Sequence, residues 1–238
     1  MIVQACINGA RPQGYHPRLP LTVDAIASDA ADCVAAGAGE LHIPARGPDG
    51  RESLSAVDET VRAVRRTCPG TFVGVSTGAW IESDETRTRD CIAAWRELPD
   101  YASVNLSERD APAVIGLLHS MGVGVEAGLA TVADAERLVA LADCRRALRI
   151  LIEIEEPDLV RADAVADGIA KVLDQAGVWR PILLHGSEAT VWHFVKRAHE
   201  MRWSTRVGLE DGSQLPNGQT AAGNAALVSE TVRLRAPS

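Results

Sequence analysis

Aromatic residues and several well-known catalytic motifs are scarce or missing in this 238-residue sequence. Aromatic residues make up 4% of the chain and hydrophobic residues 46%, so we expect a core of aliphatic side chains. There is no GxSxG motif and no Walker A motif, which argues against α/β-hydrolase and P-loop chemistry. No apolar run approaches the roughly 20 residues that a membrane-spanning helix needs, so we expect no membrane partner.

An excess of positive charge and paired cysteines are missing as well. The net charge of −8 argues against nucleic acid as a partner. The 5 cysteines have no CxxC spacing, and an odd, dispersed set is typical of reduced thiols. The first residues follow a strand pattern and lack the basic and apolar regions of a signal peptide. We therefore expect a cytoplasmic protein.

Strand-like and helix-like segments alternate along the whole chain. Eight pairs recur at a spacing of about 30 residues, which predicts a parallel sheet covered by helices and matches a small (β/α)8 TIM barrel. The predicted strands are 2–7, 40–45, 71–76, 101–105, 123–126, 148–154, 181–184 and 204–209. The predicted helices are 23–36, 55 or 58 to 66, 84–97, 111–120, 131–143, 161–175, 189–201 and 220–234.

A doubly wound open sheet is the alternative architecture. Such sheets usually carry a GxGxxG turn after the first strand, whereas Asn8-Gly9-Ala10 is followed here by prolines. The sequence shows no linker and no shift in composition. We therefore predict a single catalytic barrel domain over residues 1–238.

Polar residues stand at the end of nearly every predicted strand. In a barrel of this kind the C-terminal strand ends carry the active site. Half of such residues could instead be solvated loop positions. The candidates are Asn8, Arg11, His42, Arg46, Ser76, Thr77, Asn105, Glu126, Glu153, Glu155, His185, Arg206, Glu210 and Asp211.

The segment 206–211 concentrates charge at the end of the last predicted strand. Arg206 and Glu210 have the same parity, so in a strand they point to one face. Buried, they would be costly unless paired, hydrogen-bonded or metal-bound, and a structural ion pair is the simplest interpretation. Arg206 could alternatively hold Asp211 ionised and oriented as a base.

Two further groups of residues suggest ligand binding. His42, Glu210 and His185 are the two histidines and one carboxylate that suit a catalytic zinc, although a lone buried histidine is more often a core residue. The turn from Ser76 to Ala79 offers hydroxyls and backbone amides for a carboxylate or phosphate. An ordinary Ser/Thr turn explains the same pattern.

An ordered set of motifs resembles one known family over essentially the whole chain. The set resembles the β-keto acid cleavage enzyme family, whose founding activity is 3-keto-5-aminohexanoate cleavage, in a short form. Its pieces are Asn8-Gly9-Ala10, residues 19–22, 37–38, 41–46 and 48–51, Ser76-Thr77-Gly78, residues 102–105 and 206–211, Asn224-Ala225, and Leu227-Val228.

The resemblance implies a (β/α)8 barrel, a transferase activity and a set of site residues. Family members condense a β-keto acid with acetyl-CoA, their co-substrate, to give acetoacetate and a new acyl-CoA thioester. A zinc ion polarises the substrate, and the enzymes are usually homo-oligomers. The residues carried over are His42 and Glu210 for zinc, Arg206 and Asp211 for the α-proton, Ser76, Gly78 and Ala79 for the substrate carboxylate, and Asn105 for substrate contact; Thr77 and Arg46 are further substrate-binding candidates.

The sequence departs from the family pattern at two positions. The family's HxH zinc motif has Pro44 in place of its second histidine, which should weaken metal binding unless His185 completes the site. Arg11 stands where the founding activity has a glutamate, which favours an anionic or neutral substrate tail. Two other hypotheses therefore stay open: a metal-independent lyase or aldolase acting on a small oxo-acid, and a non-catalytic relative that binds CoA or a carboxylate.

Overall fold

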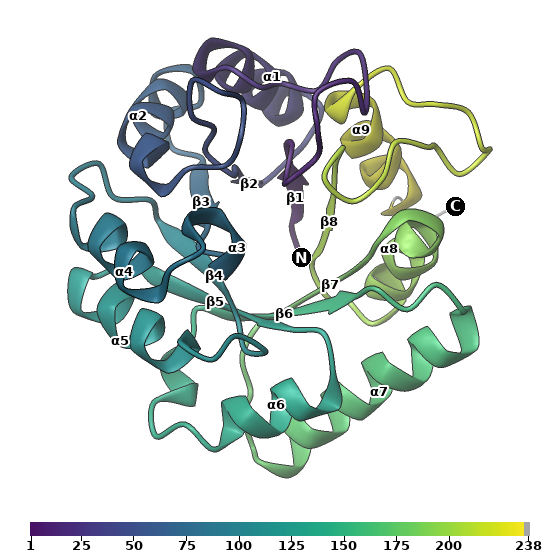
Figure 1. The fold of residues 1–238 in the computed structure, drawn as a ribbon. Helices are drawn as coiled ribbons and strands as arrows, with labels where there is room; N and C mark the ends of the chain where they lie inside the picture. The colour runs from purple at the N-terminus through teal and green to yellow at the C-terminus, as the bar shows by residue number, and fades with distance from the viewer. Residues whose placement is uncertain (236–238) are drawn as a thin grey trace.

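The computed structural model describes residues 1–235 as a ring of parallel strands surrounded by helices (Figure 1). The strand order is β7-β6-β5-β4-β3-β2-β1-β8, and a parallel bridge from Leu183 to Ser204 brings β8 back to β7. The predicted (β/α)8 barrel is confirmed. The strands are β1 (Val3–Cys6), β2 (Glu40–His42), β3 (Phe72–Ser76), β4 (Tyr101–Asn105), β5 (Gly124–Leu129), β6 (Arg149–Ile154), β7 (Ile182–Gly186) and β8 (Thr205–Val207).

Helices cover the outside of the ring, and local sequence signals set where several of them begin. Thr22 and Thr131 accept hydrogen bonds from the backbone N–H groups of Ala25 and Asp134, as N-cap residues do. The helices are α1 (Val23–Ala35), α2 (Val57–Thr67), α3 (Ala79–Glu82), α4 (Glu85–Ala93), α5 (Ala111–Met121), α6 (Val132–Val139), α7 (Leu159–Gln175), α8 (Val191–Glu200) and α9 (Asn224–Arg235), with 3₁₀ turns η1 (Leu54–Ala56), η2 (Cys144–Arg146) and η3 (Glu188–Thr190).

Several elements are shorter than predicted: β2 ends at residue 42 instead of 45, α4 at 93 instead of 97, α6 at 139 instead of 143, and α9 begins at 224 instead of 220. Three further differences bear on the site. The short helix α3 lies in a segment that was predicted as a loop. Strand β8 ends at Val207 rather than at residue 209, so Glu210 and Asp211 lie in the turn that follows. Strand β5 continues to Leu129, which places Glu126 inside the barrel instead of at the predicted strand end.

The N-terminal half of the barrel interior is a buried polar layer. Arg149 Nε lies 2.6 Å from Glu126 Oε2, and its guanidinium also pairs with Glu40 and stacks 4.6 Å from the centre of the Tyr101 ring. Gln4 Nε2 donates to Glu126 Oε2 at 3.1 Å and to Tyr101 Oη at 2.8 Å. These partners compensate the buried charges, so this layer closes the barrel floor beneath the C-terminal rim.

The space between strands and helices is filled by aliphatic side chains, as the composition predicts. Within residues 1–235, none of the helices combines the length and apolar character that crossing a bilayer requires.

Candidate active site

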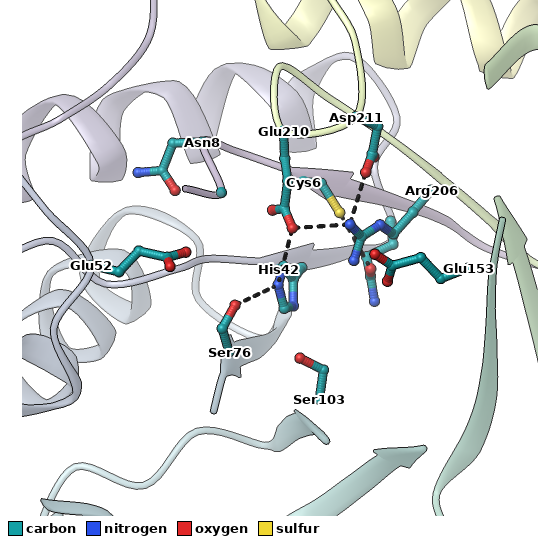
Figure 2. A network of polar contacts seen from close by, with 12 residues as sticks. Cys6, Asn8, His42, Glu52, Ser76, Ser103, Glu153, Arg206, Glu210 and Asp211 are labelled. Carbon is teal, nitrogen blue, oxygen red and sulfur yellow. Dashed lines mark hydrogen bonds and ion pairs between the residues drawn. The ribbon is translucent and has the colours of Figure 1, made fainter. Parts of the chain in front are cut away.

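Four predicted rim residues meet at the C-terminal ends of β2 and β8 (Figure 2). One nitrogen of Arg206 lies 3.0 Å from Glu210 Oε1 and 2.8 Å from Asp211 Oδ1. The same Glu210 oxygen lies 3.8 Å from His42 Nε2. Arg206, Asp211 and His42 are each at most 3% exposed. The chain therefore brings an arginine, two carboxylates and a histidine together although 168 sequence positions separate His42 from Glu210.

Close backbone packing between β1 and the end of β8 holds this cluster in place. A Cβ atom on Gly208 would lie 1.7 Å from the Cys6 carbonyl oxygen, so a side chain is excluded there. Gly9 has a φ of +49° and touches the Glu210 side chain. Because both positions accept only glycine without distortion, the chain can turn directly after β8 and present Glu210 and Asp211 side by side.

The electrostatics of the cluster keep Arg206 charged. Burial acts to lower its pKa, but the neighbouring acidic groups, Asp211 first, outweigh burial and raise the pKa well above its ordinary value. Burial raises the pKa of Glu210 to about 7, although Arg206 opposes the rise. Near neutral pH Glu210 is therefore partly protonated, so the carboxylates beside Arg206 together carry less than two negative charges.

His42 is a neutral histidine in this environment. Burial, reinforced by the charge of Arg206, lowers its pKa to about 4. Its Nε2 lies 3.1 Å from Ser76 Oγ at the end of β3. Its Nδ1 is buried and has no hydrogen-bond partner in residues 1–235. His42 is thus only half satisfied by the protein, unlike an ordinary core histidine.

His42 Nδ1 is one of several buried polar atoms at the rim that lack a hydrogen-bond partner within the described part of the chain. Buried polar groups are normally hydrogen-bonded, and each exception calls for an explanation such as a ligand or a water molecule. They belong to side chains that contact one another, so one bound molecule could satisfy several of them. These atoms are His42 Nδ1, Arg206 Nε, Glu210 Oε2 and Asp211 Oδ2.

His185 lies on the far side of Asp211 from His42. Its Nδ1 is 3.5 Å from Asp211 Oδ1, and its Nε2 is 3.4 Å from Glu153 Oε2 at the end of β6. Burial acts to raise the pKa of Glu153, but His185 and Arg206 outweigh burial and lower it to about 2. His185 therefore supports the Asp211 side of the cluster, and its ring joins two carboxylates.

The predicted zinc ligands do not all lie together in the structure. Of the predicted ligands, His42 and Glu210 lie together, but His185 contacts Glu153 and Asp211. Within residues 1–235, no three His, Cys, Asp or Glu side chains are grouped as a metal site requires. A catalytic zinc needs three protein ligands, so the residues present do not fit it.

The predicted carboxylate-holding turn already contacts a carboxylate of the protein. Glu108 Oε1 accepts hydrogen bonds from the Ala79 N–H at 2.9 Å and from Asn105 Nδ2 at 3.5 Å. Thr77 Oγ1 donates to the Ser103 carbonyl at 2.7 Å, so that hydroxyl is engaged in the fold. An acidic side chain from the loop after β4 therefore occupies the place predicted for the substrate's carboxylate.

The two predicted rim arginines are engaged by the protein itself. Arg11 Nε donates to the Glu210 carbonyl at 2.9 Å, and its other end lies 2.5 Å from Glu188 Oε1. Arg46 donates to the carbonyls of Gly50 at 2.6 Å and Arg11 at 3.0 Å, and also to those of Asn8 and Gly9. Arg46 thus anchors the loop after β1, and Glu188 neutralises the charge expected from Arg11.

A cleft of about 930 Å³ lies at the rim beside Arg11. The loops after β1, β2 and β3 line it, and Arg11, which donates to Glu210, is among its walls. Trp80, 54% exposed, stands in the same wall and donates to Glu52 at 2.5 Å. The cleft is large enough for an extended ligand, and Arg11 links its wall to the backbone of Glu210.

Sequence reasoning missed four residues that the structure places in or next to the site. They are Cys6, Glu52, Glu108 and Glu188. Cys6 is the last residue of β1, and strand position alone could have found it. Glu52 and Glu108 lie outside the helices and strands, and Glu188 begins the 3₁₀ turn η3. Nothing in the sequence indicates which of these segments folds back over the rim.

Comparison with known proteins assigns the family. The model of the beta-keto acid cleavage enzyme family matches residues 1–171. The chain belongs to this family. The resemblance predicted from the motifs is therefore confirmed. The 3-keto-5-aminohexanoate cleavage enzyme of Fusobacterium nucleatum is 33% identical to this chain over 81 residues, which are 33% of this chain and 30% of that enzyme.

Solved structures share the fold at low sequence identity. The apo structure of ObcA has a TM-score of 0.72 at 18% identity, covering 91% of this chain and 61% of that one. ObcA in ternary complex with a C4-CoA adduct and oxalate gives 0.73 at 19%, covering 91% and 63%. Type I 3-dehydroquinate dehydratase from Clostridium difficile gives 0.64 at 14%, covering 98% and 92%. This beta-keto acid cleavage family member thus spans less than two thirds of the ObcA chains.

Proposed function

We propose that this chain is an acyltransferase that cleaves a β-keto acid with acetyl-CoA, giving acetoacetate and a new acyl-CoA thioester. The observation that carries the proposal is the Arg206–Asp211 pair, whose side chains are 2.8 Å apart. Around this pair, several buried polar atoms at the barrel rim have no hydrogen-bond partner in residues 1–235. Family membership supplies the reaction class. The CoA adduct seen in ObcA, which shares the fold, supports a thioester as the second substrate.

In this proposal the β-keto acid binds across the cluster before any bond changes. Its carboxylate takes the place of Glu108 at the Ala79 N–H and the Asn105 amide, beside Ser76. Its keto oxygen accepts a hydrogen bond from the free Nε–H of Arg206. The thioester enters through the cleft of about 930 Å³.

Asp211 then removes the α-proton, with its carboxylate held in place by Arg206. The α-carbon of the enolate attacks the acetyl carbonyl, a carbon–carbon bond forms, and the CoA thiolate leaves. The thiolate attacks the original keto carbonyl, and the bond from that carbon to the α-carbon breaks. The acetoacetate enolate takes the proton back from Asp211. Every atom of both substrates appears in the two products, and no external oxidant or reductant is needed.

The experiment is a panel of β-keto acids incubated with acetyl-CoA and purified protein, with acetoacetate and the new thioester measured by mass spectrometry. The proposal predicts that both products appear in equal amounts for at least one member. Omission of acetyl-CoA is the control, because spontaneous decarboxylation also consumes β-keto acids. If neither product forms across the panel, with and without added zinc, the proposal is wrong.

A second candidate function is a metal-independent lyase or aldolase acting on a small oxo-acid. The incomplete donor set around His42 and Glu210 favours it, because such an enzyme needs no metal ligand. The two functions differ in their need for a thioester. Cleavage of an oxo-acid without acetyl-CoA would support the lyase, whereas ligand binding without turnover would support a non-catalytic relative.

A further inference from the structure

The end of β2 offers one strong metal donor where a metal site would need two. His42 Nε2 lies 3.8 Å from Glu210 Oε1, a spacing that one ion could bridge. Side chains two positions apart on an extended segment point to the same side, so residue 44 is the next chance for a ligand. The Ile43 N–H donates to the Gly74 carbonyl at 2.8 Å, which keeps this segment alongside β3.

Position 44 is occupied by a buried proline, whose side chain has no atom able to bind a metal. The other donors nearby have partners of their own. Ser76 Oγ lies 3.1 Å from His42 Nε2, and His185 lies between Glu153 and Asp211. Asp211 is paired with Arg206 at 2.8 Å, and within residues 1–235 no three His, Cys, Asp or Glu side chains are grouped for a metal. His42 and Glu210 therefore remain, one ligand fewer than a catalytic zinc requires.

We propose that residue 44 decides whether this site holds a divalent metal. Pro44 leaves the donor set at His42 and Glu210, and a histidine at this position would complete it. The inference concerns the site of the proposed function. Metal binding is measured without turnover, so the two can fail separately.

Zinc titration of the whole chain tests the inference, with zinc competed against a chromophoric chelator. The wild type and His42→Asn should bind zinc equally weakly. Pro44→His should bind one zinc per chain at least about 10-fold more tightly than the wild type. Residues that only contact a metal's ligands already change metal affinity by about this factor, and a direct ligand should change it by no less. The double variant Pro44→His/His42→Asn should lose this gain. Pro44→Ala is the matched control, because it removes the proline without adding a ligand, and it should behave as the wild type.

Two results would overturn the inference. One is a wild type that binds one zinc tightly in a way that His42→Asn abolishes. The other is a Pro44→His protein with an unchanged circular dichroism spectrum that gains no affinity. If Pro44→His does not fold, the comparison of wild type with His42→Asn decides alone. Weak wild-type binding together with no acetoacetate on the β-keto acid panel would leave the inference standing and remove the proposed function.

Discussion

Arg206 contacts two carboxylates that follow it by four and five residues, and this spacing gives them different environments. Asp211 faces both Arg206 and His185, whereas Glu210 faces Arg206 and the neutral His42. Burial raises the pKa of Glu210 to about 7. Neighbouring carboxylates in different environments are a common way to separate a proton acceptor from a positioning group. Asp211 is the better placed of the two to accept the α-proton.

Replacing Asp211 with asparagine tests that assignment. The amide oxygen can still accept from Arg206, but the side chain can no longer take a proton. We expect kcat for acetoacetate formation to fall by about 10²- to 10⁴-fold with little change in KM. Asp167→Asn is the matched control, because that side chain is 70% exposed on α7 and pairs with Arg197. An Asp211→Asn enzyme with near wild-type kcat would rule Asp211 out as the base.

Glu108 offers a second test at the residue scale, because its carboxylate competes for the Ala79 and Asn105 donors. We expect Glu108→Ala to lower KM for the β-keto acid roughly 2- to 10-fold, the net worth of a hydrogen bond or two, and to leave kcat unchanged. Glu108→Gln should fall between the two, since it keeps an acceptor and loses the charge. Steady-state kinetics at fixed acetyl-CoA measure the effect. A raised KM would mean that Glu108 builds the site.

The sequence predicts which residues reach the rim better than it predicts what they do there. His42, Arg206, Glu210 and Asp211 could be found because each stands at or just after a strand end, and parallel strands end at one rim. The engagement of Arg11 by Glu188 could not, because 177 positions separate them and the contact depends on how a loop folds. The substrate role predicted for Arg11 stays a prediction, and its contact with Glu188 is a feature that the sequence did not indicate.

Among the elements, α9 is hydrogen-bonded to the turn of the site through the side chain of Asn224. Asn224, the first residue of α9, is fully buried. Its Oδ1 accepts from the Leu209 N–H at 2.7 Å, and its Nδ2 donates to the Ile7 carbonyl at 2.8 Å and to Asp29 Oδ2 at 2.6 Å. Asn224 thereby fixes the turn that carries Glu210.

Asn224→Ala should destabilise the protein by roughly 2–4 kcal/mol, because it leaves buried donors and acceptors unpaired. Urea unfolding followed by circular dichroism measures the change. Asn217→Ala, in an exposed loop, is the control and should stay within about 0.5 kcal/mol of the wild type. A loss below about 1 kcal/mol would show that water replaces these contacts.

Asp29 on α1 makes stability depend on pH. Burial raises its pKa from 3.8 to about 6, although the hydrogen bond from Asn224 opposes the rise. The folded state therefore binds the proton more tightly than the unfolded state, and this contribution is present below pH 3.8 and lost as pH rises through 6.

Asp29→Asn should therefore raise Tm by roughly 3–6 °C at pH 8 and by much less at pH 3.5, where the wild-type carboxyl is already neutral. Differential scanning fluorimetry at the two pH values measures the difference. Asp90→Asn, exposed in the middle of α4, is the control. An equal shift at both pH values would mean that the ionisation of Asp29 is not its cause.

The presence of most helices and strands could be predicted from the alternating sequence patterns. The residues at which they end could not, because those depend on packing in the folded chain. Strand β8 was predicted to reach residue 209, but Gly208 lies against the Cys6 carbonyl and the chain turns there. Helix α3 was missed because a four-residue helix has too few positions to show a period. The α1 and α6 starts were predicted correctly because Thr22 and Thr131 act locally.

At the scale of the molecule, the barrel separates stability from chemistry. The N-terminal half holds a layer of buried ion pairs around Arg149, while the C-terminal rim holds the cluster of His42, Arg206, Glu210 and Asp211. All eight strands belong to one sheet over one core, and on this basis we propose that the chain is a single domain. A chain that covers 61–63% of the ObcA chains thus still contains a whole barrel and its rim.

Transfer of an acetyl label tests the central claim most directly, because it follows the carbon atoms that the Arg206–Asp211 site is proposed to join. Acetyl-CoA carrying carbon-13 in both acetyl positions is incubated with the enzyme and an active β-keto acid. We predict that the label appears in the two carbons of acetoacetate farthest from its carboxylate, and that the new thioester is unlabelled. Label that remains on CoA, or that is released as acetate, would contradict the account.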